Sequence, residues 1–127
     1  MDINEINVLV LAYFGDSIYE NYVRKFLIKK GIANVNDLQK EAVHYVSGIR
    51  QCTYVKFMMD NRFLNEDECR IVLRARNNKS KAHPKNCDII TYKYATGLEA
   101  LIGFLGLQNN FKRIDQIMNY ILEVAEC

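Results

Sequence analysis

Two carboxylates stand out because each lies inside a strongly apolar stretch of the chain. Asp16 occurs within LAYFGDSIYE, and Glu99 occurs within YATGLEALIGFLGL. An ionised carboxylate is costly to remove from water unless it pairs with a cation or coordinates a metal ion. Mg²⁺ takes one or two carboxylates and completes its shell with water or phosphate oxygens. The two acids could therefore serve phosphate chemistry, although 83 positions separate them and their spacing alone does not show that they meet.

Small residues accompany each acid on the expected helix face. Gly15 precedes Asp16, and Gly103 and Gly106 fall on the same helical face as Glu99. A glycine inside a helix costs about 1 kcal/mol relative to alanine, so these glycines favour the close approach of another backbone. The alternative interpretation needs no metal ion. In it, Asp16 is partly exposed and paired with a basic side chain, and Gly15 lies at a close helix crossing.

A basic segment extends from Arg74 to Lys93, where six basic residues stand against one acid. The segment therefore carries a net charge of +5 and the remainder of the chain −3, although the whole chain has only +2. Its centre, NNKSKAHPKNC at 77–87, is polar and contains the only proline, which predicts a loop of about ten residues. Lysines mixed with short polar side chains suit phosphates and ribose hydroxyls. The alternative is an ordinary solvated loop.

Apolar residues recur at helical spacing through most of the chain, while strand alternation and internal repeats are absent. This pattern predicts an all-α fold in a single domain, residues 1–127. Capping residues and stop signals such as Gly31 divide the chain into six helices. The expected helices are 6–28, Asn34 or Asn36 to Val46, 49–59 after a break at Gly48, Asn65 to about Arg76, Asp88 to about Leu107, and Asn109 or Asn110 to about Glu126.

Composition excludes several other classes of protein. A chain of 127 residues with 50% hydrophobic residues can bury a core of its own without disulfides. The four cysteines are Cys52, Cys69, Cys87 and Cys127. They form no CxxC pair, and the two histidines lie far from any cluster of metal ligands, so we expect no zinc site. We expect reduced thiols that are mostly buried, with Cys127 exposed. No signal peptide or membrane-length apolar run is present, so we expect a cytoplasmic protein.

Three segments, taken together and in this order, resemble the catalytic domain of the ribonuclease III family, and specifically its short Mini-III branch. LAYFGDSIYENYVR at 11–24 is similar to the first family signature. RARNNKSKAHPKNCDIITYKYAT at 74–96 is similar to the Mini-III loop, and LEALIGFL at 98–105 is similar to the second signature. The resemblance covers nearly the whole chain and implies the helical endonuclease-domain fold.

The resemblance implies roles for individual residues. Asp16 and Glu99 match the two signature acids, which implies that both are catalytic and that both hold Mg²⁺, with Glu20 a candidate for the outer shell. Larger relatives carry a further glutamate where this chain has Ala12 and an aspartate where it has Thr96. The Mini-III branch likewise lacks both acids. We therefore expect one tightly held Mg²⁺ in each site.

By the same resemblance, the protein is expected to be a Mg²⁺-dependent endoribonuclease that cleaves double-stranded RNA and leaves a 5′-phosphate and a 3′-hydroxyl. The implied substrate is precursor large-subunit (23S) ribosomal RNA in a bacterium. We expect no separate double-stranded-RNA-binding domain after Cys127, so the catalytic domain itself must hold the RNA. The residues expected to bind RNA are Lys79, Ser80, Lys85, Asn86 and Thr91, with Arg76 and Asn77 behind them.

A homodimer is also implied, in which each protomer cuts one strand, and a ribosomal protein is a candidate partner. Apolar faces that include Phe14, Ile18, Phe104 and Leu105 can be shared between the core and the dimer interface. Two alternatives remain open from the sequence. One is a non-catalytic RNA-binding or ribosome-associated module of the same fold, and the other is a helical protein-interaction domain without a nucleic-acid partner.

Overall fold

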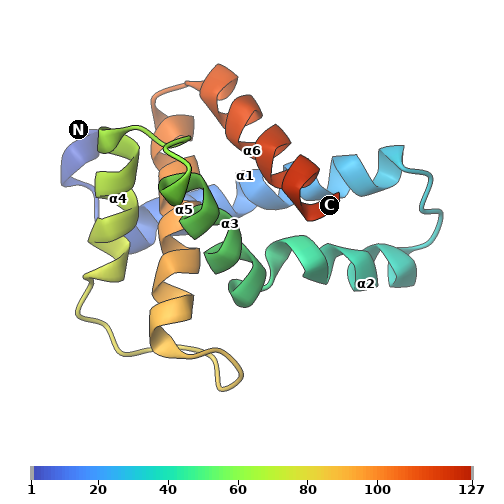
Figure 1. Ribbon diagram of the computed structural model, residues 1–127, viewed down its shortest axis with the longest axis horizontal. Coiled ribbons are helices and arrows are strands. Elements are labelled where there is room, and N and C mark those ends of the chain that lie inside the picture. The colour runs from blue at the N-terminus through green and yellow to red at the C-terminus, as the bar shows by residue number, and fades with distance from the viewer. Residues whose placement is uncertain (1, 127) are drawn as a thin grey trace.

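Helices account for the regular structure of this computed structural model, which describes residues 2–126. No strand occurs within that range, so the predicted all-α fold is confirmed. The predicted exposure of Cys127 concerns a residue outside it. The helices are η1 (Ile3–Glu5), α1 (Val8–Lys29), α2 (Val35–Val46), α3 (Gly48–Asp60), α4 (Glu66–Arg76), α5 (Ile89–Leu107) and α6 (Phe111–Glu126) (Figure 1).

Polar side chains at the helix starts explain most of these boundaries. The residues that cap α1 to α5 each accept a hydrogen bond from a backbone N–H of the first turn, which satisfies a donor that the helix cannot pair internally. They are Asn7, Asn34, Ser47, Asn65 and Asp88. At Asn65 the cap is reciprocal, because Glu68 accepts a hydrogen bond from the Asn65 backbone N–H in a capping box. The predicted helix start at Asn65 is thus confirmed.

Residues after the helix ends show the complementary signals. Gly31 has a φ of +93°, a left-handed conformation that glycine adopts without strain, so the predicted stop after α1 is confirmed. Ser47 lies between α2 and α3 and begins the second of them, with Gly48 as the first helical residue. The predicted break therefore falls one residue before Gly48.

Helix α5 is the centre of the fold. Its buried residues lie on all sides of the helix, and α1, α3, α4 and α6 all pack against it. Figure 1 shows α5 running through the molecule with α1 crossing behind it and α4 beside it. A helix that is apolar all round is typical of a central position, because each of its faces finds a neighbour. The same helix carries Glu99, so the packing of α5 determines the position of that acid.

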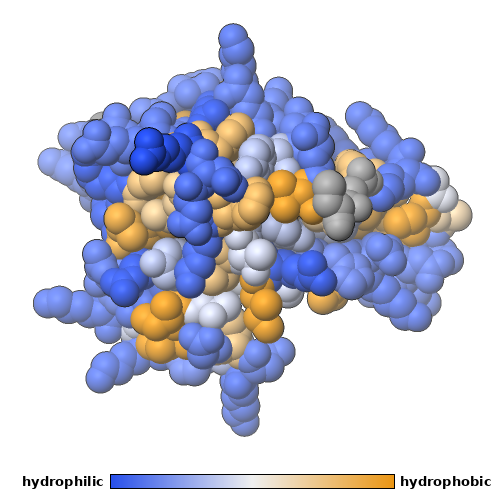
Figure 2. Space-filling model, in the orientation of Figure 1, coloured by the Kyte–Doolittle hydropathy of each residue, from blue (hydrophilic) through white to orange (hydrophobic). Residues whose placement is uncertain are grey.

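The segment between α4 and α5 is the predicted loop. Residues 77–88 contain no helix and extend beyond the helical body at the bottom of Figure 1. Figure 2 shows that hydrophilic side chains dominate this face of the molecule and project from its lower edge, with apolar patches between them. The prediction of a loop at 77–87 is confirmed.

The thiols differ from the expectation in one respect. All three described cysteines are free, but only Cys52 is buried, whereas Cys69 and Cys87 are half-buried. The prediction that the thiols are mostly buried is therefore wrong. Cys69 lies on the outer side of α4 and Cys87 lies in the loop before α5, where the chain covers them only in part. Within the described part of the chain, no helix is both long and apolar enough to cross a membrane.

Candidate active site

Two glycines bring the backbones of α1 and α5 into direct contact. A Cβ atom on Gly15 would lie 1.7 Å from the backbone oxygen of Glu99. A Cβ atom on Gly103 would lie 1.9 Å from the backbone oxygen of Leu11. Real atoms cannot approach this closely, so only hydrogen fits at either position. The predicted close helix crossing at Gly15 is confirmed.

The crossing places Asp16 of α1 beside Glu99 of α5. Burial, a hydrogen bond with Asp16 and repulsion from the Asp16 charge together raise the pKa of Glu99 to about 9, while a hydrogen bond from Gln51 lowers it. Asp16 is exposed and Glu99 is half-buried. Near neutral pH Glu99 therefore keeps its proton when no cation is present.

Neither acid has a basic counter-charge. Of the ion pairs formed by described residues, none involves Asp16 or Glu99, so the alternative in which a basic side chain neutralises Asp16 is wrong. Glu20, one turn after Asp16, does form an ion pair, with Arg24 at 3.3 Å. The charge of Glu20 also contributes to the raised pKa of Glu99, which places it near the pair.

The donor set fits a hard divalent cation. Two carboxylates that repel one another and lack a basic partner are stabilised by a cation between them, and oxygen ligands are those that Mg²⁺ prefers. Residues 2–126 contain no group of three or more His, Cys, Asp and Glu side chains arranged to hold a metal ion. The remaining ligands of a cation at this pair would have to be water or substrate oxygens.

The two positions at which this chain lacks the acids expected in larger relatives supply no further acid ligand. Ala12 and Thr96 are both buried. The Thr96 hydroxyl donates a hydrogen bond to the backbone oxygen of Tyr92 at 2.9 Å, within its own helix. Both positions therefore belong to the packed interior, and the site depends on Asp16 and Glu99.

Two residues near the acids could not be identified from sequence patterns. Gln51 of α3 is buried and lowers the pKa of Glu99, and Tyr19 of α1 is fully buried. In the sequence, Gln51 is marked only as a polar residue within an apolar run, and many exposed residues fit the same description. Its significance depends on the packing of α3 against α5.

The residues predicted to bind RNA fall into two groups. Six of them lie exposed at the end of α4 and along the loop: Arg76, Asn77, Lys79, Ser80, Lys85 and Asn86. Thr91 differs, because it is half-buried in the first turn of α5 and its hydroxyl donates to the Asp88 carboxylate at 2.6 Å. Lys93 donates a hydrogen bond to the backbone oxygen of Asn78, which fixes the start of the loop against α5.

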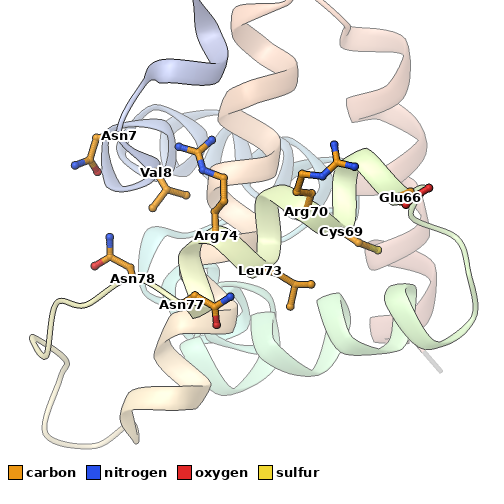
Figure 3. A pocket seen from close by; sticks show the side chains of 9 residues that line it. All are labelled: Asn7, Val8, Glu66, Cys69, Arg70, Leu73, Arg74, Asn77 and Asn78. Carbon is orange, nitrogen blue, oxygen red and sulfur yellow. The ribbon is translucent and has the colours of Figure 1, made fainter.

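A surface cavity lies elsewhere on the molecule. It has a volume of 690 Å³ and lies between the start of α1 and the outer side of α4 (Figure 3). Arg70, Arg74 and Asn77 line it, whereas Asp16 and Glu99 do not. The cavity contains no pair of carboxylates, so the candidate active site is the acid pair at the helix crossing.

Comparison with known proteins assigns this site to a family. A sequence profile described as the Ribonuclease III domain matches residues 9–110, which include both acids, Gln51 and the loop. The chain belongs to the ribonuclease III family. It is therefore an endoribonuclease, and the resemblance drawn from the two signatures and the loop is confirmed.

Relatives place the chain in the short branch of the ribonuclease III family. It is 36% identical over 126 residues to the Mini-ribonuclease 3 of Streptococcus pneumoniae, which covers 99% of this chain and 98% of that protein. It is 42% identical over 125 residues to the Mini-ribonuclease 3 of Brevibacillus brevis, covering 98% and 92% of the two chains. A crystal structure of a protein from Fusobacterium nucleatum superposes with a TM-score of 0.83 at 33% identity and covers 96% of each chain.

Proposed function

We propose that this ribonuclease III family member is a Mg²⁺-dependent endoribonuclease that cleaves double-stranded RNA, with Asp16 and Glu99 as catalytic residues and metal ligands. The observation that carries the proposal is that these two carboxylates lie side by side, with neither in an ion pair among the described residues, so that burial and the neighbouring Asp16 raise the pKa of Glu99 to about 9. An acid whose pKa is strongly shifted beside a second acid is typical of functional sites. Glu20 is the candidate for the outer shell.

Each acid has a distinct position in the proposed mechanism. Asp16 is exposed and faces the solvent from which RNA arrives, while Glu99 is recessed at the backbone contact that fixes its distance from Asp16. A bound Mg²⁺ would supply Lewis-acid chemistry, acidifying a water molecule and offsetting the charge that develops on the phosphate. The expected products carry a 5′-phosphate and a 3′-hydroxyl. Because Glu99 keeps a proton without the cation, occupancy of the site requires the loss of that proton.

RNA binding is proposed for the exposed loop residues. Lys79, Lys85 and Asn86 extend from the body where a duplex can reach them, and A-form RNA presents its phosphates and 2′-hydroxyls across a wide, shallow minor groove. Thr91 can only accept a hydrogen bond from RNA while its own proton is donated to Asp88.

The remaining proposals concern substrate and assembly. We propose one catalytic domain over residues 1–127, a bacterial cytoplasmic location, precursor 23S ribosomal RNA as substrate, a homodimer, and a ribosomal protein as candidate partner. Exposed apolar side chains on α1 support the dimer, because Tyr13 is 84% exposed and Val10 is 56% exposed. Phe14, Ile18 and Phe104 retain exposed surface, whereas Leu105 is buried and belongs to the core.

The decisive experiment compares the wild type with Asp16→Asn on a long RNA duplex. Wild type should cut in Mg²⁺ and not in EDTA, and Asp16→Asn should cut more than about 100-fold more slowly, since loss of a direct ligand exceeds the effect of losing an outer partner. Asp60→Asn, an exposed acid of α3, is the matched control and should retain activity. Cleavage by Asp16→Asn at the wild-type rate would refute the site. Retention of RNA without cleavage by the wild type would favour the non-catalytic RNA-binding module.

The loop is tested by the salt dependence of RNA binding, measured with Asp16→Asn as the uncleaving background. Replacing both Lys79 and Lys85 by alanine should reduce the slope of log affinity against log salt concentration by about 2, because each phosphate contact contributes nearly one. Lys40→Ala with Lys112→Ala removes the same charge from exposed positions outside the loop. Equal slopes for the two double variants would mean that the loop is only solvated.

A further inference from the structure

We propose that the cavity between the start of α1 and the outer side of α4 is a second RNA-binding site, in which arginine and asparagine side chains hold one phosphate of the RNA backbone outside the candidate active site. The volume of this cavity is 690 Å³, which falls within the range of about 300–1,000 Å³ that is usual for ligand sites. The proposal rests on the proposed function, because its ligand is the same RNA that the acid pair is proposed to cut.

Arg74 of α4 lines the cavity as a half-buried base without an acidic partner. None of the ion pairs formed by described residues involves it, and its guanidinium donates a hydrogen bond to the backbone oxygen of Ile6 at 2.9 Å. A guanidinium carries several N–H donors, so one such bond leaves most of them free. A partly desolvated cation without a counter-charge is stabilised by an anion, and the planar guanidinium matches phosphate oxygens well.

Arg70 supplies a second cation one helical turn before Arg74. Both residues line the cavity, and Figure 3 shows their guanidinium groups on the same side of α4. Arg70 pairs with Asp67 at 2.8 Å, but these two side chains are 65% and 82% exposed. Ion pairs that water reaches so freely contribute little, so a bound phosphate can draw Arg70 away from Asp67.

Three asparagines that line the cavity offer hydrogen-bond donors. In each of them the amide oxygen already accepts a hydrogen bond of 2.8–2.9 Å from an N–H group, and these residues are Asn7, Asn77 and Asn78. Because an N–H group cannot accept, these bonds establish which amide atom is oxygen and which is nitrogen. No hydrogen bond between described residues uses the three amide nitrogens, so their N–H₂ groups remain free to donate to a ligand.

The charges that line the cavity are separated along α4. The one acid among the lining residues, Glu66, precedes Arg74 by eight residues, or about 12 Å along the helix axis. Figure 3 shows Glu66 at one end of the cavity, and Arg74 with the three asparagines at the other. That second end combines positive charge with N–H donors. It suits the oxygens of a phosphodiester, which accept hydrogen bonds and donate none.

Continuity with the loop indicates that RNA supplies the phosphate. Asn77 and Asn78 line the cavity and are also the first two residues of the loop at 77–88. The Asn78 backbone is held on both sides, since its N–H donates to the Ala75 oxygen at 3.1 Å and its own oxygen accepts from Lys93. Lys79 follows directly. RNA bound by the loop lysines therefore has its neighbouring phosphates beside the cavity, an advantage that a free phosphate ion lacks.

The test is the salt dependence of binding to an RNA duplex, measured in the uncleaving Asp16→Asn background. Arg70→Gln combined with Arg74→Gln should weaken binding about 10-fold and reduce the slope of log affinity against log salt concentration by about 1, because one phosphate contact is lost. Arg62→Gln combined with Lys112→Gln removes the same charge from exposed positions outside the cavity and is the matched control. Equal slopes for the two double variants overturn the proposal.

Arg70→Gln alone guards against a folding defect, since Arg74 also holds the Ile6 carbonyl. Arg70 is exposed, so this variant should fold and should weaken RNA binding in the same direction by a smaller factor. If the double variant does not fold, wild-type affinity and slope in Arg70→Gln overturn the proposal.

Inorganic phosphate is the second probe, followed through the side-chain amide signals of ¹⁵N-labelled protein. Shifts of the Asn7, Asn77 and Asn78 signals that disappear in the arginine double variant support phosphate binding in the cavity. The same shifts together with equal RNA slopes would mean that the cavity takes a free phosphate compound, and would overturn RNA as its ligand. A reduced RNA slope without such shifts supports RNA as the ligand.

Failure of the proposed function has a different signature. If the wild type neither binds nor cuts an RNA duplex, the proposed function and the role of the cavity are both rejected. If the wild type binds and cuts RNA while the two double variants give equal slopes, the cavity alone is rejected.

Discussion

Two glutamates in this molecule are removed from water in opposite ways. Glu68 of α4 is buried and receives two hydrogen bonds from the Arg113 guanidinium, each 2.8 Å long. That guanidinium also donates to the backbone oxygen of Phe63 at 2.7 Å and lies over the Phe63 ring. Glu99 of α5 has another acid beside it, and among the described residues it forms no ion pair with a basic group. The comparison shows that burial alone does not indicate function, whereas burial without a counter-charge does.

The two arrangements have different consequences for stability. The Glu68–Arg113 pair joins α4 to α6, and its hydrogen bonds raise the pKa of Arg113. The α1–α5 crossing that carries Asp16 and Glu99 is held by backbone packing, and no ion pair of the described residues involves either acid. Substitutions at the first pair should therefore affect folding, and substitutions at the second should affect chemistry.

The largest expected effect follows from Gly15→Ala, which acts on the crossing and leaves the Glu68–Arg113 pair untouched. The added methyl group would overlap the Glu99 backbone oxygen, so α1 and α5 must separate. We expect a loss of about 4 kcal/mol or more in the free energy of unfolding, together with loss of cleavage. Urea unfolding measures the first and an RNA duplex the second. Wild-type stability in this variant would show that the two backbones do not touch.

Glu68→Gln should have the next largest effect, on stability alone. It leaves the partly buried Arg113 without its counter-charge, which costs about 3 kcal/mol in the free energy of unfolding. The folded fraction should cleave RNA at the wild-type rate, because neither acid of the site has moved. Glu66→Gln, at an exposed position of the same helix, is the control and should be nearly neutral. Loss of activity in folded Glu68→Gln would contradict the assignment of stability to the Glu68–Arg113 pair and of chemistry to the Asp16–Glu99 pair.

A smaller effect on stability, its dependence on pH, distinguishes Glu99 from Glu68. Without a cation the folded protein holds a proton on Glu99 up to about pH 9, whereas the unfolded chain releases it near its ordinary pKa of 4.5. The folded state therefore binds more protons between these values, and this group's contribution to stability falls as the pH rises from about 5 to 9. Glu99→Gln should remove that decline and abolish cleavage. Parallel stability curves for Glu99→Gln and wild type in EDTA would contradict the raised pKa.

Local signals in the sequence predicted most of the fold. Asn65 and Gly31 gave correct helix ends, because caps and left-handed glycines act within a few residues of where they stand. The first helix begins at Val8 and not at Ile6, since the Asn7 side chain caps it. The loop at 77–88 followed from its polarity and lack of periodicity.

Tertiary contacts limited what the sequence could show of the site. The glycines beside Asp16 and Glu99 indicated a close crossing, but only the packed helices bring the two acids together. Gln51 gave no pattern of its own, because its significance comes from Tyr19 and Glu99 on other helices. The pairing of Glu68 with Arg113, 45 positions away, was equally invisible to residue spacing.

Helix α5 connects the loop to the acids by a rigid link. Asp88 caps this helix and Glu99 lies eleven residues later, which corresponds to about 16 Å along its axis. A helix neither stretches nor shortens under ordinary forces, so a duplex bound at the loop would meet the acids at a constant offset. The distance between the loop contact on the RNA and the cleaved phosphate would then be set by the length of α5 between Asp88 and Glu99. Inserting one helical turn into this part of α5 would lengthen that distance by about 5 Å.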